Sequence, residues 1–433
     1  MNLLKDNWTY AKVSDFAELL RGISYKKDES RKESQKGYKP MLRSNNINYE
    51  LNFIDLVYVP EKKIKSIQFI KEGDIIFAMS SGSKHLVGKS AQSKCNYDGS
   101  YGAFCGLLRV SNLMNKKYVG LFFKSQEYRK YISRISKGTN INNLKRDHIL
   151  EINFPLAPLN EQNRIVEKIE ELFSDLDKAT EDLKKTQEQL KIYRQAVLKA
   201  AFEGKLTEEW RMRNNLRLSF KEVSLKDTAD IIMGQSPPSS TYNFEKIGLP
   251  FYQGKKEFGN LYPTPEKYCS KPEKIAKSND ILISVRAPVG PTNICKEKSC
   301  IGRGLAAIGA KEEINRNYLL YFLRYFVFNL IKKSTGTTFN AISKATLEGF
   351  KVLLFSLSEQ EQMVQEIESR LSVCDKLEDT IQQSLNKIEY LRQSILKKAF
   401  EGKLVSQDPN DLPACELLKQ IKNKKDKMSK NGK

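Results

Sequence analysis

One stretch of this chain occurs twice. Residues 159–206 align without a gap to residues 357–404, and 19 of the 48 aligned positions are identical. The copies agree best at their ends, in a Glu-Gln pair near the start and in the string AFEGKL at the finish. A period of 198 residues is far too long for a solenoid and is typical of a duplicated module. The chain is therefore predicted to be two half-molecules in tandem, each a globular part followed by a repeated segment.

Each copy of the repeat has the apolar spacing of one long helix. Apolar residues alternate at intervals of three and four, and neither copy has a proline or an internal glycine before Gly204 and Gly402. These two glycines are predicted to be C-terminal helix caps. The predicted seam is Ile165, Ile169, Leu172, Leu176, Ala179, Leu183, Thr186, Leu190, Tyr193 and Val197 in the first helix, and Met363, Ile367, Cys374, Leu377, Ile381, Ser384, Ile388, Leu391 and Ile395 in the second, where Arg370 interrupts it.

A seam kept over about five heptads is typical of a coiled coil. We expect the two helices to pair with each other, antiparallel, because the long module between them can bring the chain back. The simpler alternative is that each helix packs only on its own globular part.

The two globular parts share a weaker common plan. Each opens with an apolar segment and a glycine turn, at residues 13–24 and 225–236, followed by apolar strands and an aromatic helix. Each closes with a predicted Gly-Thr turn, at residues 137–144 and 335–342. We therefore predict an α+β fold class with two α/β domains. The predicted domains are residues 1–158 and 207–356, the spacer helices 159–206 and 357–404, and a basic tail 405–433 that ends as a short, fraying helix.

Positive charge is concentrated on the two globular parts. Of the net charge of +21, residues 1–158 carry +12 and residues 207–356 carry +9. The repeated helices are near balance, at −1 and −2, and the tail carries +3. An excess confined to two modules points to a polyanion held at two places, and nucleic acid is the obvious candidate. A general enrichment in lysine explains part of this excess, but not why the helices lack it.

Several classes of protein are disfavoured by what the sequence lacks. Its longest apolar run, at residues 318–331, is interrupted by Arg324 and fits a buried helix better than a membrane span. Seven cysteines without a CxxC pair favour a reducing cytosol, so we expect a cytoplasmic protein. Cys295 and Cys300 fit core packing better than a metal site. With only two histidines, His85 and His148, histidine-dependent catalysis has little room.

Two strings resemble catalytic motifs but fail in detail. The string SGSKHLVGKS at 81–90 has Ser83 where a phosphate-binding loop requires glycine, and Gly82 is one residue too far. The string SPPS at 236–239 ends in Ser239, whereas the tetrapeptide of amino-methyltransferases ends in an aromatic residue that stacks on the flipped base. We therefore expect no catalytic residues, no metal and no cofactor in this chain.

Five features together resemble the specificity subunit of type I restriction-modification systems. They are the doubled helix with its AFEGKL end, GQSPPSSTYN at 234–243, SVRAPVG at 284–290 with CIGRGLAAI at 300–308, GTTFNAISK at 336–344, and DLPACELLKQIK at 411–422. The resemblance covers essentially the whole chain. No single string is decisive, and their joint occurrence with the repeat is specific.

The resemblance implies a non-catalytic subunit that recognises DNA. Each recognition domain would read one half of a bipartite double-stranded target, while the helices set the spacing and dock two methyltransferase subunits. Motor-nuclease subunits would complete a complex that methylates adenine at N6 and cleaves DNA with ATP. The partner subunits would use S-adenosylmethionine, ATP and Mg²⁺, and no membrane is implied.

Candidate DNA contacts are polar residues in loops next to the predicted strands. Lys and Arg can bind phosphates, while Arg, Lys, Asn, Gln and Ser can read base edges. The first domain offers Arg43, Ser44, Asn45, Asn46, Ser81, Ser83, Lys84, His85, Thr139 and Asn142. The second offers Gln253, Lys255, Lys256, Arg286, Arg303, Thr337 and Asn340. The alternative for Arg286 and Arg303 is a structural role, and for the Gly-Thr segments a helix cap.

Three other interpretations remain. A single-chain enzyme is disfavoured because neither catalytic motif is intact. A non-catalytic coiled-coil scaffold would bind without sequence preference and leaves the charge distribution unexplained. The specificity subunit of a fused nuclease-methyltransferase system would have the same features.

Overall fold

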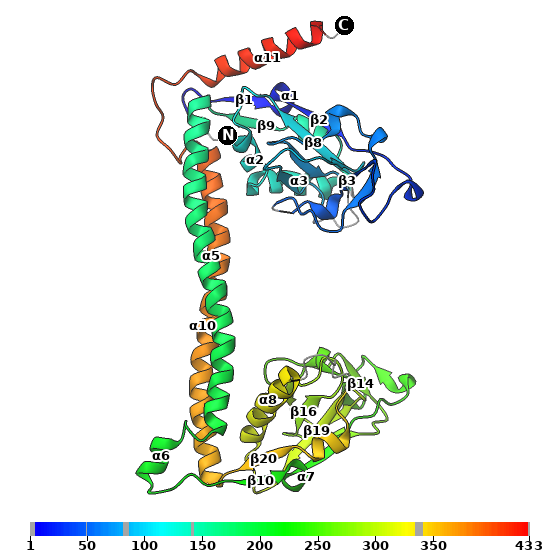
Figure 1. Cartoon of the computed structure of the whole chain (residues 1–433), viewed down its shortest axis with the longest axis vertical. Helices are drawn as coiled ribbons and strands as arrows, with labels where there is room; N and C mark the ends of the chain where they lie inside the picture. Colours follow the sequence, from blue (N-terminus) through cyan, green and yellow to red (C-terminus); the bar gives the residue numbers. More distant parts are fainter. Residues whose placement is uncertain (1–4, 49, 81–85, 140–142, 334–340, 432–433) are drawn as a thin grey trace. The chain divides into compact units, whose positions relative to one another are not determined.

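The computed structural model describes residues 5–48, 50–80, 86–139, 143–333 and 341–431. It forms two compact units, Met1–Asp182 with Ser384–Lys433, and Leu183–Gln383. Each unit combines one globular module with parts of two long helices, α5 (Leu159–Phe202) and α10 (Leu357–Phe400), each continuous over 44 residues (Figure 1). The predicted pair of long helices is thus confirmed.

Both long helices end in the predicted glycine cap. Gly204 has φ +74° and Gly402 has φ +68°, which is left-handed backbone that glycine adopts without strain. The amide of Lys205 donates to the carbonyl of Ala200 at 2.8 Å, and that of Lys403 donates to the carbonyl of Lys398 at 2.7 Å. This is the Schellman pattern. The repeated string AFEGKL is therefore a helix terminator.

Within each unit, a segment of α5 lies antiparallel to a segment of α10 (Figure 1). In the first unit Arg392 binds Asp177 at 2.6 Å, and its guanidinium lies 5.0 Å from the centre of the Phe173 ring. In the second unit Arg194 binds Asp375 at 2.6 Å. The two arginines occupy equivalent positions of the repeat, as do the two aspartates. The same ion pair therefore forms once in each unit.

The predicted seam is only partly correct. Most of its members are buried or half-buried, but Thr186, Tyr193, Leu377 and Leu391 are exposed. An α-helix has 3.6 residues per turn, so positions chosen at a strict spacing of 3.5 drift around the helix. Tyr193 and Leu391 are equivalent positions of the repeat, and the drift exposes both.

The described residues of the first module form nine short strands and four α-helices. Its strands are β1 (Thr9–Lys12), β2 (Ala17–Arg21), β3 (Tyr38–Leu42), β4 (Val57–Pro60), β5 (Ile75–Ala78), β6 (Ser90–Gln92), β7 (Ser100–Tyr101), β8 (Cys105–Val110) and β9 (Asn153–Leu156). Its helices are α1 (Val13–Phe16), α2 (Lys116–Phe122), α3 (Gln126–Thr139) and α4 (Asp147–Leu150). They form sheets of order β1-β9, β2-β8-β5-β6 and β4-β3-β7.

The second module repeats this plan. Its strands are β10 (Lys221–Ser224), β11 (Ala229–Met233), β12 (Tyr242–Asn243), β13 (Leu249–Tyr252), β14 (Lys267–Cys269), β15 (Ile275–Ala276), β16 (Ile281–Ser284), β17 (Thr292–Ile294), β18 (Ser299–Ile301), β19 (Leu305–Ala310) and β20 (Lys351–Leu354). Its helices are α7 (Leu225–Thr228), α8 (Arg316–Lys333) and α9 (Lys344–Glu348), and α6 (Glu208–Arg213) precedes it. The sheets have the order β10-β20, β11-β19-β16-β17 and β12-β14-β13-β18-β15.

The landmarks predicted from the sequence correspond in the two modules. Strands β5 and β16 are buried throughout, as expected for apolar runs of this length. The apolar run at 318–331 lies in α8, and no helix of the described residues is long and apolar enough to cross a membrane. The first predicted Gly-Thr turn is wrong, because α3 continues to Thr139. The second, at 335–342, falls largely outside the described residues.

Two repeated contacts join each module to the helices. Gln162 and Gln360, both fully buried, donate to the carbonyls of Ala157 and Phe355 at 2.8 Å. The side-chain oxygen of each glutamine also accepts from a backbone N–H, that of Asn115 at 3.1 Å and that of Asn315 at 2.7 Å. Buried amides that bond the backbone on both sides hold the start of each helix against its module.

The second contact is aromatic. Phe400, at the end of α10, packs on Tyr118 and Phe122 with ring centres 5.2 and 5.3 Å away. Phe202, at the end of α5, packs on Tyr318 and Phe322 at 5.5 and 5.3 Å. The repeated phenylalanine is therefore part of the core of each module.

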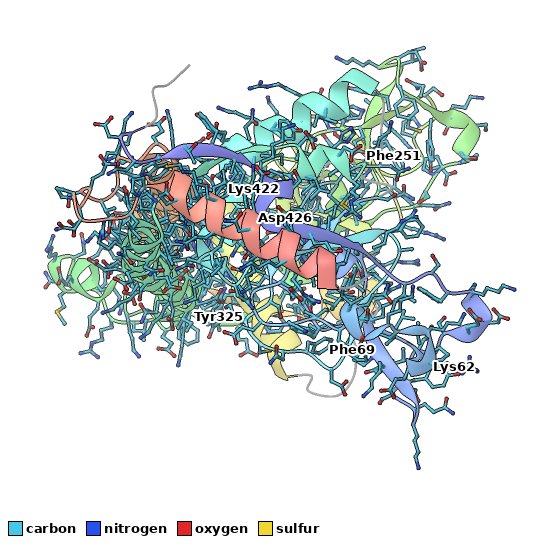
Figure 2. All side chains as sticks on the ribbon, turned by 90° about the horizontal axis from the view of Figure 1, so that it is seen from above. Lys62, Phe69, Phe251, Tyr325, Lys422 and Asp426 are labelled. Carbon is cyan, nitrogen blue, oxygen red and sulfur yellow. The ribbon has the colours of Figure 1, made fainter. Side chains whose placement is uncertain are left out.

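The C-terminal tail differs from the predicted fraying helix. Residues Ala414–Asn431 form helix α11, and Ala414, Leu417 and Ile421 are buried in the core of the first module. Lys422, labelled on this helix in Figure 2, binds Asp15 of α1 at 3.2 Å. The apolar face of the tail has a tertiary partner, which the lysine-rich sequence obscured.

A buried aspartate has an arginine partner in the first module, whereas its counterpart in the second module has no ion-pair partner among the described residues. Asp74 immediately precedes β5 and binds Arg109 of β8 at 2.5 Å. Asp280 immediately precedes β16, and the position that corresponds to Arg109 is Gly309. Both aspartates are almost fully buried. Burial raises the pKa of Asp280 above its ordinary value of 3.8, against the lowering effect of a hydrogen bond from the Lys277 amide.

Replacing these two aspartates by asparagine is expected to have opposite effects at pH 7. Asp280→Asn should stabilise the second unit, because the buried carboxylate no longer has to ionise. Asp74→Asn should destabilise the first unit by about 2 kcal/mol, because Arg109 loses its charged partner. Thermal unfolding of the full chain measures the change in stability of each variant, and hydrogen exchange shows in which unit the change occurs.

The pH dependence provides the control. A carboxyl with a raised folded pKa contributes its full stability below its unfolded pKa, near 3.8, and loses it as the pH rises through the folded value. The advantage of Asp280→Asn should therefore shrink as the pH falls toward 4. If both substitutions changed stability in the same direction at pH 7, the different roles given to Asp74 and Asp280 would be wrong.

Candidate nucleic-acid interface

Three backbone segments meet at one edge of the first module. They are the glycine turn after β2, the end of β3, and residues 101–104, which run from the end of β7 to the start of β8. The amide of Ile23 donates to the carbonyl of Tyr101 at 2.8 Å, and that of Gly102 donates to Leu42 at 2.9 Å. The ladder continues because the amide of Ala103 donates to the carbonyl of Ile23 at 2.9 Å.

The second module brings the corresponding segments together. The amide of Gln235 donates to the carbonyl of Ile301 at 3.0 Å, and that of Gly302 donates to Tyr252 at 2.8 Å. A Cβ atom on Gly234 would lie 2.2 Å from the carbonyl oxygen of Gly302, and one on Gly22 would lie 2.0 Å from that of Gly102. The predicted glycine turns are therefore required by close backbone approach.

This edge presents different side chains in the two modules. The residue after β3 is Arg43, and the residue after β13 is Gln253. The tip of the next loop carries Ala103 and Phe104 in the first module and Arg303 and Gly304 in the second. The frame is shared, whereas the chemistry at its tip changes from an aromatic ring to a guanidinium.

In the second module the structure places several candidates at or beside this edge. Gln253 and Arg303 are exposed on adjoining segments, since a Cβ on Gly304 would lie 2.5 Å from the carbonyl oxygen of Gln253. Arg286 is exposed just after β16, where Val285 accepts from and donates to the neighbouring backbone. Among the described residues, neither arginine has an ion-pair partner, so both remain available to an anion.

Two further candidates lie in a short 3₁₀ turn that follows β13. Lys255 and Lys256 are exposed, and Lys256 binds Glu266 at 2.6 Å. Hydrogen bonding to this carboxylate raises the pKa of Lys256, which stays charged. Surface pairs of this kind are weak and exchange readily for a phosphate.

In the first module the four clustered candidates differ in availability. Asn46 is 1% exposed, accepts from the Arg43 amide at 2.9 Å and donates to the carbonyl of Ile54 at 2.8 Å. Its amide group is already committed to the fold. Arg43 is half-buried and donates to the carbonyl of Asp55 at 2.7 Å, while its Nε has no partner. Ser44 is half-buried and Asn45 is exposed.

Eight candidates cannot be placed. Ser81, Ser83, Lys84, His85, Asn142, Thr337 and Asn340 lie outside the described residues, and Thr139 ends α3 with a side chain that also lies outside them. These residues stay predictions.

Sequence reasoning missed two residues at this edge. Phe104 is 69% exposed at the tip of its loop and presents a large apolar ring to solvent. Ser236 accepts from the Arg303 amide at 3.2 Å through its hydroxyl, next to the second glycine turn. The glycine turns were visible in the sequence. Only the hydrogen bonds of the folded chain show that the loops of Phe104 and Arg303 lie next to these turns.

The chemistry of this edge is that of binding. Exposed guanidinium, ammonium and amide groups can contact phosphates and base edges, and an exposed ring can stack on a base. In the part of the chain that the structure describes, no three His, Cys, Asp or Glu residues lie together as a metal site would require. Cys295 and Cys300 are fully buried, and burial raises the pKa of their thiols to about 11 and about 12.

The sequence matches one protein family in both halves. The family is described as the type I restriction modification DNA specificity domain, and it matches residues 5–191 and 218–390. Two matched segments agree with the two modules and their following helices.

Individual relatives match over nearly their whole length. The specificity subunit of the type I restriction enzyme EcoKI from Escherichia coli K12 is 32% identical over 97% of this chain and 96% of its own. A putative specificity subunit, MjaX of Methanocaldococcus jannaschii, is 32% identical over 93% of this chain and 94% of its own.

Solved structures have the same fold. A chain solved to explain complex assembly and conformational transition of the type I R-M system is 30% identical, with a TM-score of 0.73 over 93% of this chain and 100% of its own. The HsdS subunit from Thermoanaerobacter tengcongensis is also 30% identical, with a TM-score of 0.54 over 93% of this chain and 98% of its own.

Proposed function

This chain belongs to the family of type I restriction-modification DNA specificity subunits, and we propose that each of its modules reads one half of a bipartite double-stranded DNA target. The observation that carries the proposal is the three-segment edge that occurs in both modules with different side chains. A shared frame gives both modules the same approach to the duplex. Different tips give each module its own sequence preference.

The exposed groups of each edge suggest how they contact DNA. In the second module Arg303, Arg286 and Gln253 suit base edges or phosphates, with Lys255 and Lys256 on phosphates. In the first module Asn45 and Arg43 offer polar groups, and Phe104 offers a ring to pack on a base or sugar. The candidates Ser81, Ser83, Lys84 and His85, which lie outside the described residues, remain part of this proposal.

We assign the separation of the half-sites to the paired helices. A continuous helix of 44 residues is about 66 Å long at 1.5 Å per residue. Pairing stiffens it, whereas a flexible linker would let the half-sites vary in spacing and rotation.

Catalysis is assigned to partner subunits. Two methyltransferase subunits would dock along the duplicated helices, and motor-nuclease subunits would join them in the cytoplasm. Those partners would use S-adenosylmethionine, ATP and Mg²⁺ to methylate adenine at N6 and to cleave DNA. The failed phosphate-loop and methyltransferase strings support this division. A fused nuclease-methyltransferase partner would leave the role of this chain unchanged.

Deleting the gene is expected to remove one bipartite N6-methyladenine motif from the host genome. Methylation-aware long-read sequencing of the parent and the deletion strain measures this and identifies the target. Arg303→Ala should then weaken binding to that target about 10- to 100-fold, because one good contact to a base edge is worth about 1–3 kcal/mol.

The matched control is Arg217→Ala, which removes an exposed arginine outside the three segments. It should change binding less than threefold. Base substitutions in one half-site should lose their effect in the Arg303 variant, while those in the other half-site keep it. An unchanged methylome with the partner genes expressed would instead favour a scaffold that does not read sequence.

A further inference from the structure

Two cavities lie at equivalent joints between a module and its helices. The first, of about 320 Å³, is lined by Ser90, Lys124 and Gln393 together with Phe123 and neighbours. The second, of about 450 Å³, is in the other unit. Its walls include Thr292, Arg324, Gln195, Leu198, Val289 and Leu371.

The key residues of the two cavities correspond. Lys124 and Arg324 each follow by nine positions an asparagine that caps its helix, since the Asn115 and Asn315 side chains accept from the amides of Tyr118 and Tyr318 at 3.1 Å. The glutamines Gln195 and Gln393 are equivalent positions of the repeat. Ser90 and Thr292 each begin the strand that pairs with β5 or β16. A serine or threonine, a cation and a glutamine therefore recur together.

Each cavity is lined by more than one cation, and one of them, Lys124 or Arg324, lacks a carboxylate partner among the described residues. Among the described residues no carboxylate lies within ion-pair distance of Lys124 or Arg324. The Arg324 guanidinium donates to the Thr292 hydroxyl at 2.9 Å and lies 5.8 Å from the centre of the Tyr321 ring, both neutral groups. Burial lowers the pKa of both Lys124 and Arg324, and for Lys124 the charge of Glu50 offsets only part of this effect.

The side-chain oxygen of the glutamine in each cavity accepts no hydrogen bond from the described residues. The Oε1 atoms of Gln195 and Gln393 are buried and make no hydrogen bond. The Gln393 side-chain nitrogen donates to the backbone carbonyl of Lys124 at 3.4 Å, which holds the glutamine next to this residue. Buried polar groups are nearly always paired in folded proteins, so the same orphan atom in two equivalent places indicates a shared missing partner.

We propose that each cavity receives an acidic residue of a partner protein subunit, whose carboxylate binds Lys124 or Arg324 and whose backbone N–H donates to Gln393 or Gln195. The rest of the contact is apolar, through Phe123 in one cavity and Leu198, Val289 and Leu371 in the other. This inference rests on the proposed function, in which two copies of a methyltransferase subunit bind one chain.

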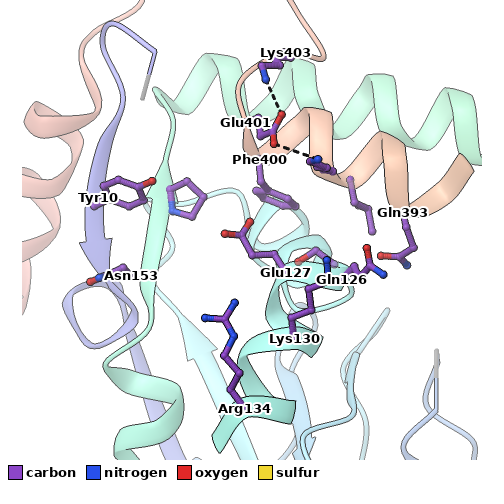
Figure 3. Close-up of a pocket in the computed structure, with 14 residues that line it drawn as sticks. Tyr10, Gln126, Glu127, Lys130, Arg134, Asn153, Gln393, Phe400, Glu401 and Lys403 are labelled. Atoms are coloured by element: carbon purple, nitrogen blue, oxygen red, sulfur yellow. Dashed lines mark hydrogen bonds and ion pairs between the residues drawn. The ribbon is translucent and has the colours of Figure 1, made fainter. Parts of the chain in front are cut away.

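A polypeptide fits these groups better than DNA. A phosphodiester supplies acceptors for the cation but has no donor for the glutamine oxygen, whereas an acidic residue supplies both. A larger cavity of about 550 Å³ borders the first one at Gln393 and is lined by both signs of charge, including Glu127, Lys130 and Arg134 (Figure 3). Its mixed charge favours no single ligand.

The test replaces each cation by methionine in the full chain, Lys124→Met and Arg324→Met. Each variant is expected to bind the methyltransferase subunit of the same restriction system at least tenfold more weakly, measured by titration calorimetry. The free chain should become more stable to heat, because an uncompensated buried charge has been removed. A structural cation would give the opposite sign.

Two controls keep the positive charge in the cavity, and a third removes a lysine outside the cavities. Lys124→Arg and Arg324→Lys should keep partner affinity within threefold. Lys62→Met, at an exposed lysine of the first module (Figure 2), should change neither affinity nor stability. In the assembled complex a carbodiimide should cross-link Lys124 to a partner aspartate or glutamate, which mass spectrometry identifies.

Two results would overturn the proposal. Unchanged partner affinity with a lower melting temperature would make the cations structural. Unchanged partner affinity with weaker DNA binding would make them phosphate contacts. Both leave the proposed function intact, because that function is read independently from the genomic methylation motif. If the motif stayed methylated in the strain that lacks this gene, the proposed function would be wrong instead.

Discussion

Inserting seven residues into each long helix is expected to lower methylation of the native target at least 100-fold. The insertions are placed after Asp182 and after Gln383, where the two compact units meet in the sequence. One heptad lengthens a helix by about 10 Å and rotates it by only about 20°. Half-sites on DNA would have to move apart by about three base pairs to follow.

The measurement is methylation of a plasmid library in which the spacer between the half-sites varies in length. Residual methylation should move to longer spacers, and it should stay weak because added base pairs also rotate one half-site around the duplex. The same seven residues appended after residue 433 serve as control and should leave the native target methylated. Undiminished methylation of the native spacing would show that the helices do not set it.

Replacing Arg211 by methionine is expected to destabilise the second unit by about 3–5 kcal/mol. Arg211 and Glu359 are both buried and bind each other at 2.5 Å. Arg211 also donates to the carbonyl of Gly204 at 2.7 Å, at the cap of α5. The substitution leaves a buried carboxylate without its countercharge and removes the arginine's hydrogen bond to the Gly204 carbonyl.

Hydrogen exchange followed by mass spectrometry measures this effect, because it reports each unit separately. Protection should fall in Leu183–Gln383 and stay unchanged in the other unit. The double variant Arg211→Met with Glu359→Gln should recover part of the loss. The exposed pair Lys191 and Glu188 provides the control, since Lys191→Met should cost less than about 1 kcal/mol. A similar cost at both pairs would contradict the role given to burial.

The repeated glutamate shows where sequence reasoning ends. Glu359 is bound by Arg211, whereas its counterpart Glu161 accepts from the indole of Trp8 at 3.0 Å and leaves Oε1 without a partner. Burial raises the pKa of Glu161. The repeat predicts that both acids occupy equivalent places, but the partners come from segments that do not resemble each other.

The candidate interface could be predicted only in part, because the sequence shows which residues follow a strand but not which of them are buried. The strings around Arg43 and Gln253 were chosen because each follows an apolar strand, and the fold places them at corresponding positions. Asn46 was indistinguishable from Asn45 in the sequence, yet one is buried with its amide committed and the other is exposed. Phe104 was overlooked because residues 102–110 were interpreted as one apolar strand, whereas β8 begins at Cys105.

The sequence by itself determined the tandem architecture, the long helices and their glycine caps. Each depends on signals within a few residues, namely apolar spacing, the absence of proline, and a left-handed position that favours glycine. Tertiary structure alone decided which seam residues stay exposed, how α11 joins the first core, and which buried charges find partners. Those outcomes depend on residues far apart in the chain, as with Lys124 and Gln393 in one cavity. No local pattern encodes the distance between such groups once the chain has folded.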